Sequence, residues 1–284
     1  MNKGTYVLGT AEPELQRLGR QHAIWREDTL SAWDRAGFGA GQRLLDLGCG
    51  PGCAALDLAA RVGPSGTVLA IDNAPNYLQH LEQQASARNL TQIRTLQLDL
   101  GQAQPPEAIG SAIGTAQWDG AWCRWLAMFL PDPEALVALA AQALRPGGRL
   151  VLHEYVQWDT FALHPEGSGL QRFVQCCIRH WQANGGDPHV ARRLPKLLEA
   201  RGLQLVSARS LMACEPSEGP KAQWLQDFLS SYPQQLAAAG VWSPADQLAL
   251  EADLEHADRH PSLWITPALV EQIWEKAAPP EASR

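Results

Sequence analysis

The stretch LLDLGCGPG occupies residues 44–52 and has the pattern of a strand that runs directly into a glycine-rich turn. Three of its last five residues are glycine, at positions 48, 50 and 52. Glycine lets the backbone adopt conformations closed to other residues and lets a ligand approach the chain closely. A helix that starts just beyond Pro51 would add free N–H groups, which favour an anionic group. The stretch therefore predicts a ligand site at the end of a strand.

Strand-like and helix-like patterns alternate along the chain around this stretch. Helical patterns of ten or more residues separate successive strands, which implies parallel pairing through right-handed crossovers. A glycine- and proline-rich link is expected between the third and fourth strands. We therefore expect an α/β fold built on an open, doubly wound, mostly parallel sheet. Its predicted strands are residues 43–49, 67–73, 93–100, 119–125, 149–156 and 203–211.

The segments outside this alternation divide the chain further. Residues 10–36 place apolar and aromatic side chains at spacings of three and four, which predicts an amphipathic helix or helix pair before the core. The stretch 263–274 could supply a closing strand, with a helix as the alternative. We expect an N-terminal helical segment, a core, an inserted cap helix with loops, a core helix and strand, and a helical cap with a closing core element; these occupy residues 1–41, 42–156, 157–190, 191–211 and 212–284.

Composition argues against several classes of function. The 284 residues carry a net charge of -7, and the 23 Lys and Arg are scattered along the chain. A nucleic-acid groove needs a clustered basic face, so no nucleic-acid partner is expected. No segment approaches the roughly 18 apolar residues of a membrane span, and a signal-peptide pattern is absent, so we expect a cytoplasmic protein without a membrane partner. The six cysteines have no CxxC pairing, so we expect reduced thiols and no metal site.

Acids at successive strand ends indicate what the glycine turn binds. Asp72 ends the second strand in LAIDNAP and can accept hydrogen bonds from both hydroxyls of a ribose. Asp99 ends the third strand in LQLDLG, where it can reach the amino edge of an adenine. A dinucleotide fingerprint would need Gly or Ala where Cys53 stands. Asp46 would repel a pyrophosphate but attract the ammonium of an amino acid, so the pattern points to S-adenosylmethionine.

These motifs resemble those of a known family. LLDLGCGPG, VLAIDNAP, LQLDLG, WDGAWCRWLAMFLPDP and LRPGGRLVLHEY resemble the successive motifs of class I S-adenosylmethionine-dependent methyltransferases across residues 42–156. The leading YVLGTAEPELQRLGRQ is similar to the N-terminal helix of one bacterial small-molecule branch of that family. The resemblance implies a Rossmann-like core that binds the cofactor, N-terminal helices that close over it, and a helical cap.

The resemblance assigns the glycine turn and the end of the second strand to two parts of the cofactor. It puts Asp46, Gly48 and Gly50 at the methionine moiety. It puts Asp72 and Asn73 at the ribose.

Other residues are carried over in the same way. The resemblance puts Asp99 and Leu100 at the adenine. Arg124 would face the cofactor or the surroundings of its methyl group. Tyr6 and Gln21 would close over the cofactor from the N-terminal helix, with ordinary surface positions as the alternative.

Methyl transfer from a sulfonium needs mainly that the nucleophile be held in line with an activated methyl group. A phenol or alcohol acceptor would also need a proton acceptor. The leading candidates for a catalytic base are His153 and Glu154 near the end of the fifth strand, where alternation sends their side chains to opposite faces. The alternative for His153 is a packed or hydrogen-bonded core histidine, and the alternative for Glu154 is a structural or cofactor-side acid. Further candidates in the inserted region are His164, His180 and His189.

We expect an enzyme that transfers a methyl group from S-adenosylmethionine to a small-molecule acceptor. Aromatic side chains in the predicted cap favour an aromatic or hydrophobic acceptor, and oxygen is favoured over nitrogen or carbon as the methylated atom. The alternatives are an NAD(P)-dependent oxidoreductase on the same type of sheet and a non-catalytic S-adenosylmethionine-binding subunit, since fold does not fix function. A homodimer is left open. The cap aromatics are Trp158, Phe161, Phe173, Trp181, Trp224, Phe228 and Trp242.

Overall fold

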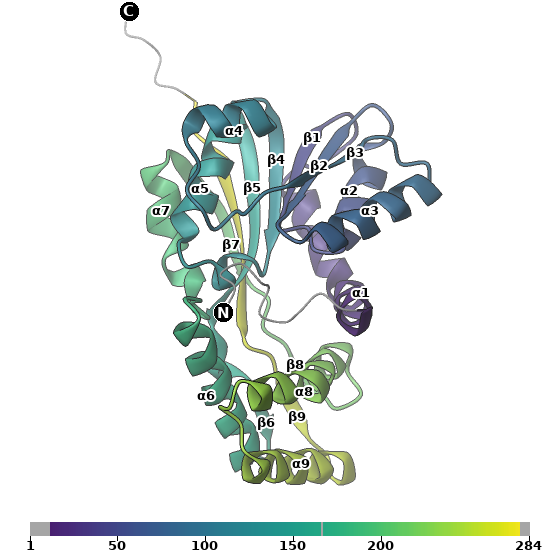
Figure 1. Ribbon diagram of the computed structural model, residues 1–284, viewed down its shortest axis with the longest axis vertical. Coiled ribbons are helices and arrows are strands. Elements are labelled where there is room, and N and C mark those ends of the chain that lie inside the picture. The colour runs from purple at the N-terminus through teal and green to yellow at the C-terminus, as the bar shows by residue number, and fades with distance from the viewer. Residues whose placement is uncertain (1–11, 166, 279–284) are drawn as a thin grey trace, which may run out of the picture.

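A seven-stranded sheet forms the centre of the protein (Figure 1). The computed structural model describes residues 12–165 and 167–278. The first five strands along the sheet run parallel, and β10 runs antiparallel to both of its neighbours. From edge to edge the strands are β3 (Ile93–Gln97), β2 (Thr67–Asp72), β1 (Arg43–Leu47), β4 (Trp118–Arg124), β5 (Leu144–Gln157), β10 (Ala268–Lys276) and β7 (Leu203–Ser210).

Helices cover both faces of this sheet, as Figure 1 shows. Each face has its own apolar core, with Leu44 and Trp122 in one and Leu45 and Cys123 in the other. Because side chains alternate across a strand, burial on both faces requires the nearly continuous apolar runs seen in β1 and β4. The doubly wound, mostly parallel sheet expected from the sequence is confirmed. One face carries α1 (Glu12–Arg35), α2 (Cys53–Val62) and α3 (Pro75–Ala87), and the other carries α4 (Pro106–Ile113), α5 (Pro133–Ala143) and α7 (Leu194–Ala200).

Helix α4 lies where the sequence predicted only a glycine- and proline-rich link. It begins at Pro106, and its buried residues are Ile109 and Ile113. Proline suits the first turn of a helix because its missing N–H is not needed there. With eight residues and only two buried positions, the helix is too short for its periodicity to be recognised in the sequence.

A second layer, here called the cap, lies below the sheet in Figure 1. Its helix α6 contains the segment that the sequence predicted as an inserted helix, and α9 packs against it. The closing stretch 263–274 forms strands, so the strand alternative is correct. The small antiparallel sheet of the cap was not predicted, because its strands have only three residues each. The cap consists of β6 (Ala162–His164), α6 (Ser168–Ala183), β8 (Cys214–Pro216), α8 (Pro220–Ala238), α9 (Pro244–Arg259) and β9 (Leu263–Ile265).

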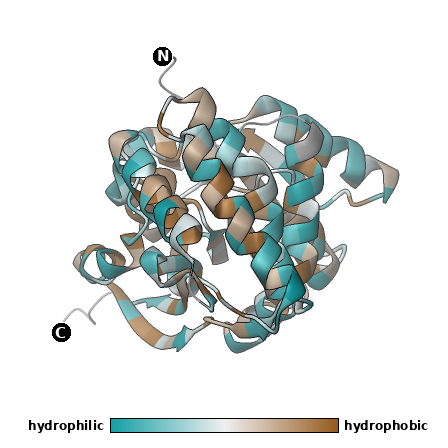
Figure 2. Ribbon diagram, turned by 90° about the horizontal axis from the view of Figure 1, so that it is seen from below, coloured by the Kyte–Doolittle hydropathy of each residue, from teal (hydrophilic) through white to brown (hydrophobic). Residues whose placement is uncertain are grey.

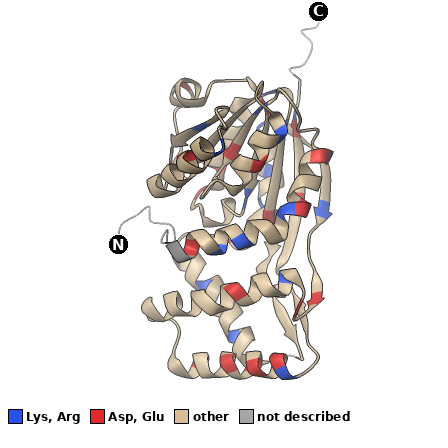
Figure 3. Ribbon diagram, turned by 90° about the vertical axis from the view of Figure 1, so that its right-hand side faces the viewer, with Lys and Arg blue, Asp and Glu red and all other residues tan. Residues whose placement is uncertain are grey.

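The surface of the protein mixes charges and apolar side chains. Viewed from the cap side, Figure 2 shows hydrophobic and hydrophilic residues alternating along the helices. Figure 3 shows acidic and basic residues interspersed over core and cap. Within residues 12–165 and 167–278, no helix is long and apolar enough to cross a bilayer. The same part of the chain holds no group of three or more His, Cys, Asp or Glu that could bind a metal ion.

Candidate active site

A cavity of about 610 Å³, here called the main cavity, lies at the carboxyl ends of the parallel strands. Ligands of open α/β sheets bind at this edge, because the strand order reverses there and leaves a crevice. Tyr6, which the sequence also assigned to the site, lies outside the described residues. The other predicted cofactor residues all line the main cavity: Gln21, Asp46, Gly48, Gly50, Asp72, Asn73, Asp99, Leu100 and Arg124.

The glycine turn between β1 and α2 forms one end of the main cavity. Gly48 and Gly50 have φ angles of 73° and 52°, in the left-handed region that side chains disfavour. A Cβ atom at Gly48 would lie 2.8 Å from the side chain of Leu126, whereas one at Gly50 would meet nothing within 4 Å. Gly48 is therefore required by packing as well as by conformation. Gly50 leaves open space in which a ligand can approach the backbone.

Asp72 at the end of β2 holds this turn in place. Its Oδ2 accepts a 2.8 Å hydrogen bond from the Gly50 backbone N–H, and its Oδ1 accepts a 2.9 Å bond from that of Ala74. Burial raises the pKa of Asp72, and these bonds oppose the increase. Each carboxylate oxygen has two acceptor sites, so both can still accept hydrogen bonds from a ligand in the main cavity.

Asp46 is the most deeply buried acid of the main cavity, with 2% of its surface exposed. Its Oδ2 has no hydrogen-bond partner among the described residues. Burial raises the pKa of its carboxyl to about 7, and the guanidinium of Arg124 lowers it in part. A buried acceptor without a donor is costly. A ligand with an ammonium group would satisfy this oxygen and favour the ionised carboxylate.

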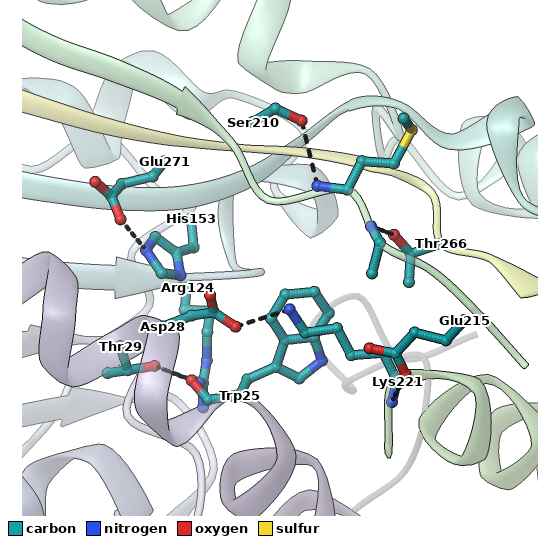
Figure 4. A network of polar contacts seen from close by, with 12 residues as sticks. Trp25, Asp28, Thr29, Arg124, His153, Ser210, Glu215, Lys221, Thr266 and Glu271 are labelled. Atoms are coloured by element: carbon teal, nitrogen blue, oxygen red, sulfur yellow. Dashed lines mark hydrogen bonds and ion pairs between the residues drawn. The ribbon is translucent and has the colours of Figure 1, made fainter. Parts of the chain in front are cut away.

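Arg124 is the last residue of β4, and a residue of α1 holds its side chain in place. Its Nη1 donates to Thr29 Oγ1 at 3.0 Å, and Thr29 in turn donates to the Trp25 carbonyl at 2.8 Å (Figure 4). Its guanidinium lies 4.9 Å from the ring centre of Trp125. Burial lowers the pKa of Arg124 to about 10, an effect that Asp46 opposes. The guanidinium therefore remains a cation at neutral pH. The main cavity is thus lined by a cation, Arg124, and an acid, Asp46.

His22 and Asp57 complete this arrangement and were not predicted as site residues. The Nδ1 atom of His22 lies 3.1 Å from Arg124 Nη2, and its Nε2 lies 3.1 Å from Asp57 Oδ2. Since a guanidinium can only donate, His22 must carry its proton on Nε2. The available sequence signal was a histidine within the apolar stripe of the first helix, where a polar side chain needs a partner.

Asp99 and Leu100 mark another part of the cavity wall, after β3. Asp99 Oδ1 accepts a 2.9 Å hydrogen bond from the Gly101 N–H, and Oδ2 accepts a 2.8 Å bond from Gln102 Nε2. Leu100 is buried and gives this part an apolar surface. An apolar wall beside a fixed acceptor suits a flat, amino-bearing ring.

A second, narrower space of about 50 Å³, here called the aromatic pocket, adjoins the main cavity. Gln21, Trp125 and Phe129 line both spaces. Four of the predicted cap aromatics line the aromatic pocket, whereas Phe161, Phe173 and Trp242 pack outside it. Its other lining residues are Arg17, Met128, Tyr155, Trp158, Trp181, Trp224, Leu225, Phe228 and Pro267.

Trp125 stands at the boundary between the two spaces. Its backbone has a φ of 52°, a conformation that is rare for a bulky residue and is found preferentially at functional sites. Its ring stacks on Trp224 with centres 5.5 Å apart and on Tyr155 with centres 6.2 Å apart. The stack joins the end of β4 to β5 and to α8, so core and cap together form the aromatic pocket.

Gln21 has its orientation fixed by two donors. Its Oε1 accepts from Arg17 Nη1 at 3.1 Å and from Trp224 Nε1 at 2.9 Å. Arg17 is held in turn by Glu14 through two bonds of 2.7 Å. Because neither an arginine nor an indole N–H can accept, the amide Nε2 of Gln21 must occupy the other position, beside the two spaces that the residue lines.

Charged side chains connect α1 to α8 beside the aromatic pocket. Lys221 Nζ lies 2.9 Å from Asp28 Oδ2 and 4.3 Å from the ring centre of Trp25 (Figure 4). Arg20 Nε donates to Asp227 at 2.7 Å. The N-terminal helix therefore contacts both the core and the cap.

The leading candidates for a base, His153 and Glu154, line neither the main cavity nor the aromatic pocket. Both are completely buried. His153 Nε2 lies 3.3 Å from Glu271 Oε2 (Figure 4). Glu154 Oε1 accepts from the backbone N–H groups of Leu126 and Ala127 at 2.9 and 2.7 Å. The structure thus places the pair beneath the site, on opposite faces of β5 as alternation predicts.

The three other candidate histidines also lie outside both spaces. His164 is exposed and His180 is half-buried. His189 Nδ1 accepts a 3.3 Å hydrogen bond from the Trp158 backbone N–H.

Comparison with known proteins supports a relationship to methyltransferases. A family model described as a methyltransferase domain matches residues 44–148. Aklanonic acid methyltransferase DauC from a Streptomyces species is 31% identical over 176 residues, which cover 61% of this chain and 74% of that protein. Methyltransferase str2 from Strobilurus tenacellus is 27% identical over 198 residues, covering 69% of this chain and 65% of that protein. The match to str2 thus spans just under two thirds of that relative's length.

A solved structure shares the fold. The geranyl diphosphate C-methyltransferase from Streptomyces coelicolor, in complex with Mg2+, geranyl diphosphate and S-adenosyl-L-homocysteine, has a TM-score of 0.58 at 14% identity and covers 94% of this chain and 85% of its own. At this identity the likeness concerns the fold alone. The family model, the relative DauC and the glycine turn all agree with this fold. The chain belongs to the class I S-adenosylmethionine-dependent methyltransferases.

Proposed function

We propose that this protein transfers a methyl group from S-adenosylmethionine to an oxygen of a small aromatic or hydrophobic acceptor. The observation that carries the proposal is the aromatic pocket, which adjoins the main cavity and shares Gln21, Trp125 and Phe129 with it. A relative named for a small-molecule acceptor, aklanonic acid methyltransferase DauC, is in agreement. The acceptor would lie among the aromatic rings, with its nucleophilic atom directed toward the main cavity.

The amino-acid arm of the cofactor fits the charges at the glycine turn. The unpartnered Oδ2 of Asp46 would receive the ammonium, and the Arg124 cation, which faces the same cavity, would attract the carboxylate. Gly48 and Gly50 would let this arm approach the backbone. Bound in this way, S-adenosylmethionine supplies an activated methyl group on a positively charged sulfur.

The adenosine part fits the ends of the next two strands. Asp72 and Asn73 would contact the ribose, the first through the acceptor sites left by its two backbone bonds. Asp99 and Leu100 would contact the adenine. Tyr6 and Gln21 would cover the cofactor, as the family resemblance implies.

The protein's own contribution would be to position the acceptor and to exclude water. Rings from core and cap close around the acceptor, and a nucleophile held in line with the methyl group loses little further entropy on reaction. We assign no base role to His153 or Glu154. Both lie outside the two spaces, and their hydrogen bonds support the backbone around β5 and β10.

Calorimetry and a turnover screen test this proposal. We expect S-adenosylmethionine to bind at micromolar strength and NAD not to bind measurably. We also expect release of S-adenosylhomocysteine with some members of a library of small phenols, enols, amines and thiols, with mass spectrometry locating the new methyl group. Binding of NAD in place of S-adenosylmethionine would favour an oxidoreductase. Tight cofactor binding without turnover across the library would indicate a non-catalytic binding subunit.

A further inference from the structure

Residues that line the aromatic pocket carry hydrogen-bond donors without an acceptor among the described residues. The indole Nε1 atoms of Trp125 and Trp181 are buried and lack a partner among the described residues. Gln21 adds an amide donor, because its Oε1 is occupied by Arg17 and Trp224. A buried donor without an acceptor lowers stability, because it has given up its hydrogen bonds to water. A bound molecule that brings acceptor atoms would remove this cost.

Among the described residues, none that lines this pocket could take a proton from the acceptor. Arg17 and Tyr155 are its titratable lining residues in the part of the chain that the structure describes. Arg17 is already paired with Glu14 through two hydrogen bonds of 2.7 Å. Burial raises the pKa of Tyr155, so its phenol stays protonated. Residues 1–11 contain no His, Asp or Glu.

The main cavity does not supply the missing base either. Its acids, Asp46, Asp72 and Asp99, do not line the aromatic pocket. His22 lines the main cavity, but both of its ring nitrogens are engaged, one by Arg124 and the other by Asp57. Without a base among the described residues of either space, the acceptor that fits best is one that arrives already deprotonated.

We infer that the aromatic pocket takes its acceptor as a preformed, charge-delocalised oxyanion, such as the enolate of a 1,3-dicarbonyl compound or an electron-poor phenolate, held by the N–H groups of Gln21, Trp125 and Trp181. This inference rests on the proposed function and narrows its substrate class. The oxyanion's lone pair forms the new O–CH3 bond while the C–S bond of the sulfonium breaks and its electron pair passes to sulfur. The two opposite charges cancel, and no proton is released in this step.

The donors also select against other acceptors. An amine brings N–H groups of its own, which would face donors instead of acceptors. An unactivated alcohol or phenol stays protonated at neutral pH and meets no base. An oxyanion, in contrast, gains from each N–H, since hydrogen bonds to a charged acceptor are stronger than neutral ones and stronger still away from water. The stacked rings suit a flat, conjugated molecule.

The ionisation state of a bound probe tests this inference without turnover. 4-Nitrophenol is suitable because only its phenolate is yellow and its proton is lost near neutral pH. In the presence of saturating S-adenosylhomocysteine, the protein should bind the phenolate about tenfold more tightly than the phenol. Equal binding of the two forms, or tighter binding of the phenol, would overturn the inference.

Two variants link the effect to the donors. Trp181→Phe keeps the ring but removes the N–H, and it should reduce the preference for phenolate about threefold or more. Gln21→Glu keeps the oxygen that Arg17 and Trp224 contact but replaces the amide donor with a carboxylate oxygen, and it should abolish the preference for phenolate.

Trp242→Phe is the matched control, because Trp242 lies outside the aromatic pocket and its Nε1 donates to Gln247 at 2.9 Å. Thermal unfolding and S-adenosylhomocysteine affinity, measured for each variant, separate a local effect from misfolding.

Methylation rates of acceptors that differ in acidity test this inference separately from the proposed function. Acidic enols and electron-poor phenols should be methylated at neutral pH, with simple phenols and alcohols at least about a hundredfold slower. Efficient methylation of simple phenols or alcohols would leave the proposed function standing and overturn the oxyanion. Efficient methylation of amines would overturn both the oxyanion and the oxygen as the methylated atom. Failure of S-adenosylmethionine to bind would overturn the proposed function itself.

Discussion

His22 Nδ1 accepts a 3.1 Å hydrogen bond from Nη2 of Arg124, across 102 positions of sequence. The bond is possible only while the imidazole is neutral, because a protonated ring has no acceptor to offer. Asp57 fixes the tautomer by taking the Nε2 proton. The position of Arg124 in the main cavity therefore depends on the protonation state of a histidine on the N-terminal helix.

Protonation of His22 should weaken cofactor binding. Burial lowers its pKa below the ordinary 6.5, although Asp57 opposes the decrease. Since the folded-state pKa is the lower one, the contribution of the neutral ring is complete above pH 6.5 and is lost as the pH falls through the folded-state value. We expect calorimetry to show about fivefold weaker binding of S-adenosylmethionine on the acid side of this transition. His22→Asn keeps an acceptor but cannot titrate, so it should remove the part of this dependence that comes from His22 and leave the part that comes from Asp46. The exposed control His256→Asn should retain both.

Asp46 should release a proton when the cofactor binds. Burial raises its pKa to about 7. The ammonium of the cofactor should lower this pKa, so binding near pH 7 should release a fraction of a proton. Calorimetry in buffers of different ionisation enthalpy measures this release. Asp46→Asn should abolish it and weaken binding. An enthalpy that does not depend on the buffer would contradict the placement of the ammonium at Asp46.

Asp46 should lower the stability of the cofactor-free protein at high pH. Because the folded-state pKa of Asp46 is raised from 3.8 to about 7, the folded protein binds more protons between these values, and stability falls as the pH rises through them. The loss is complete above about pH 7 and amounts to a few kcal/mol at most. Urea unfolding at pH 5 and pH 8 should therefore show a smaller decrease for Asp46→Asn than for the wild type.

Removal of the Asp72 carboxylate should weaken cofactor binding by roughly 1.5 to 3 kcal/mol, the cost of charge-assisted hydrogen bonds to the ribose. Asp72→Ala also removes the bonds that hold Gly50 and Ala74, so unfolding should be measured beside affinity. Asp72→Asn keeps one acceptor oxygen and should have the smaller effect on both. Unchanged affinity in Asp72→Ala would exclude Asp72 from the site.

The buried group around Glu271 should contribute to stability rather than to turnover. Glu271 accepts two hydrogen bonds from Arg35, of 2.9 and 2.5 Å, and lies 3.3 Å from His153 Nε2. Burial raises the pKa of Glu271, but the hydrogen bonds from His153 and Arg35 outweigh this effect and hold it at about 2. A lowered carboxyl pKa means that the stabilisation is complete above pH 4.5 and is lost as the pH falls toward 2.

Glu271→Gln should therefore destabilise the protein by about 2 to 4 kcal/mol at neutral pH, because it leaves buried cationic or polar partners uncompensated. His153→Gln should lower stability less and leave the rate constant of methyl transfer within about twofold. A loss of kcat of a hundredfold or more in folded His153→Gln would restore His153 as a catalytic base.

Local patterns in the sequence determined the fold class and one end of the site. The alternation of apolar runs with helical stretches indicated the sheet, and the positions of the glycines and of Asp46, Asp72 and Asp99 indicated a cofactor at its carboxyl edge. Such features could be read because each depends on residues adjacent in the chain. The eight-residue α4 and the three-residue strands of the cap were too short for the same reasoning.

The tertiary structure decided how the aromatic pocket is built. Gln21 is oriented by Trp224, 203 positions away, and no local pattern could show which end of its amide Trp224 contacts. His153 and Glu154 had the right residue types near the right strand end, but packing placed both beneath the site. The sequence determined the cofactor end because motif spacing encodes it in consecutive residues. The aromatic pocket depends on side chains from α1, β4, β5 and α8 that meet only when core and cap fold against each other.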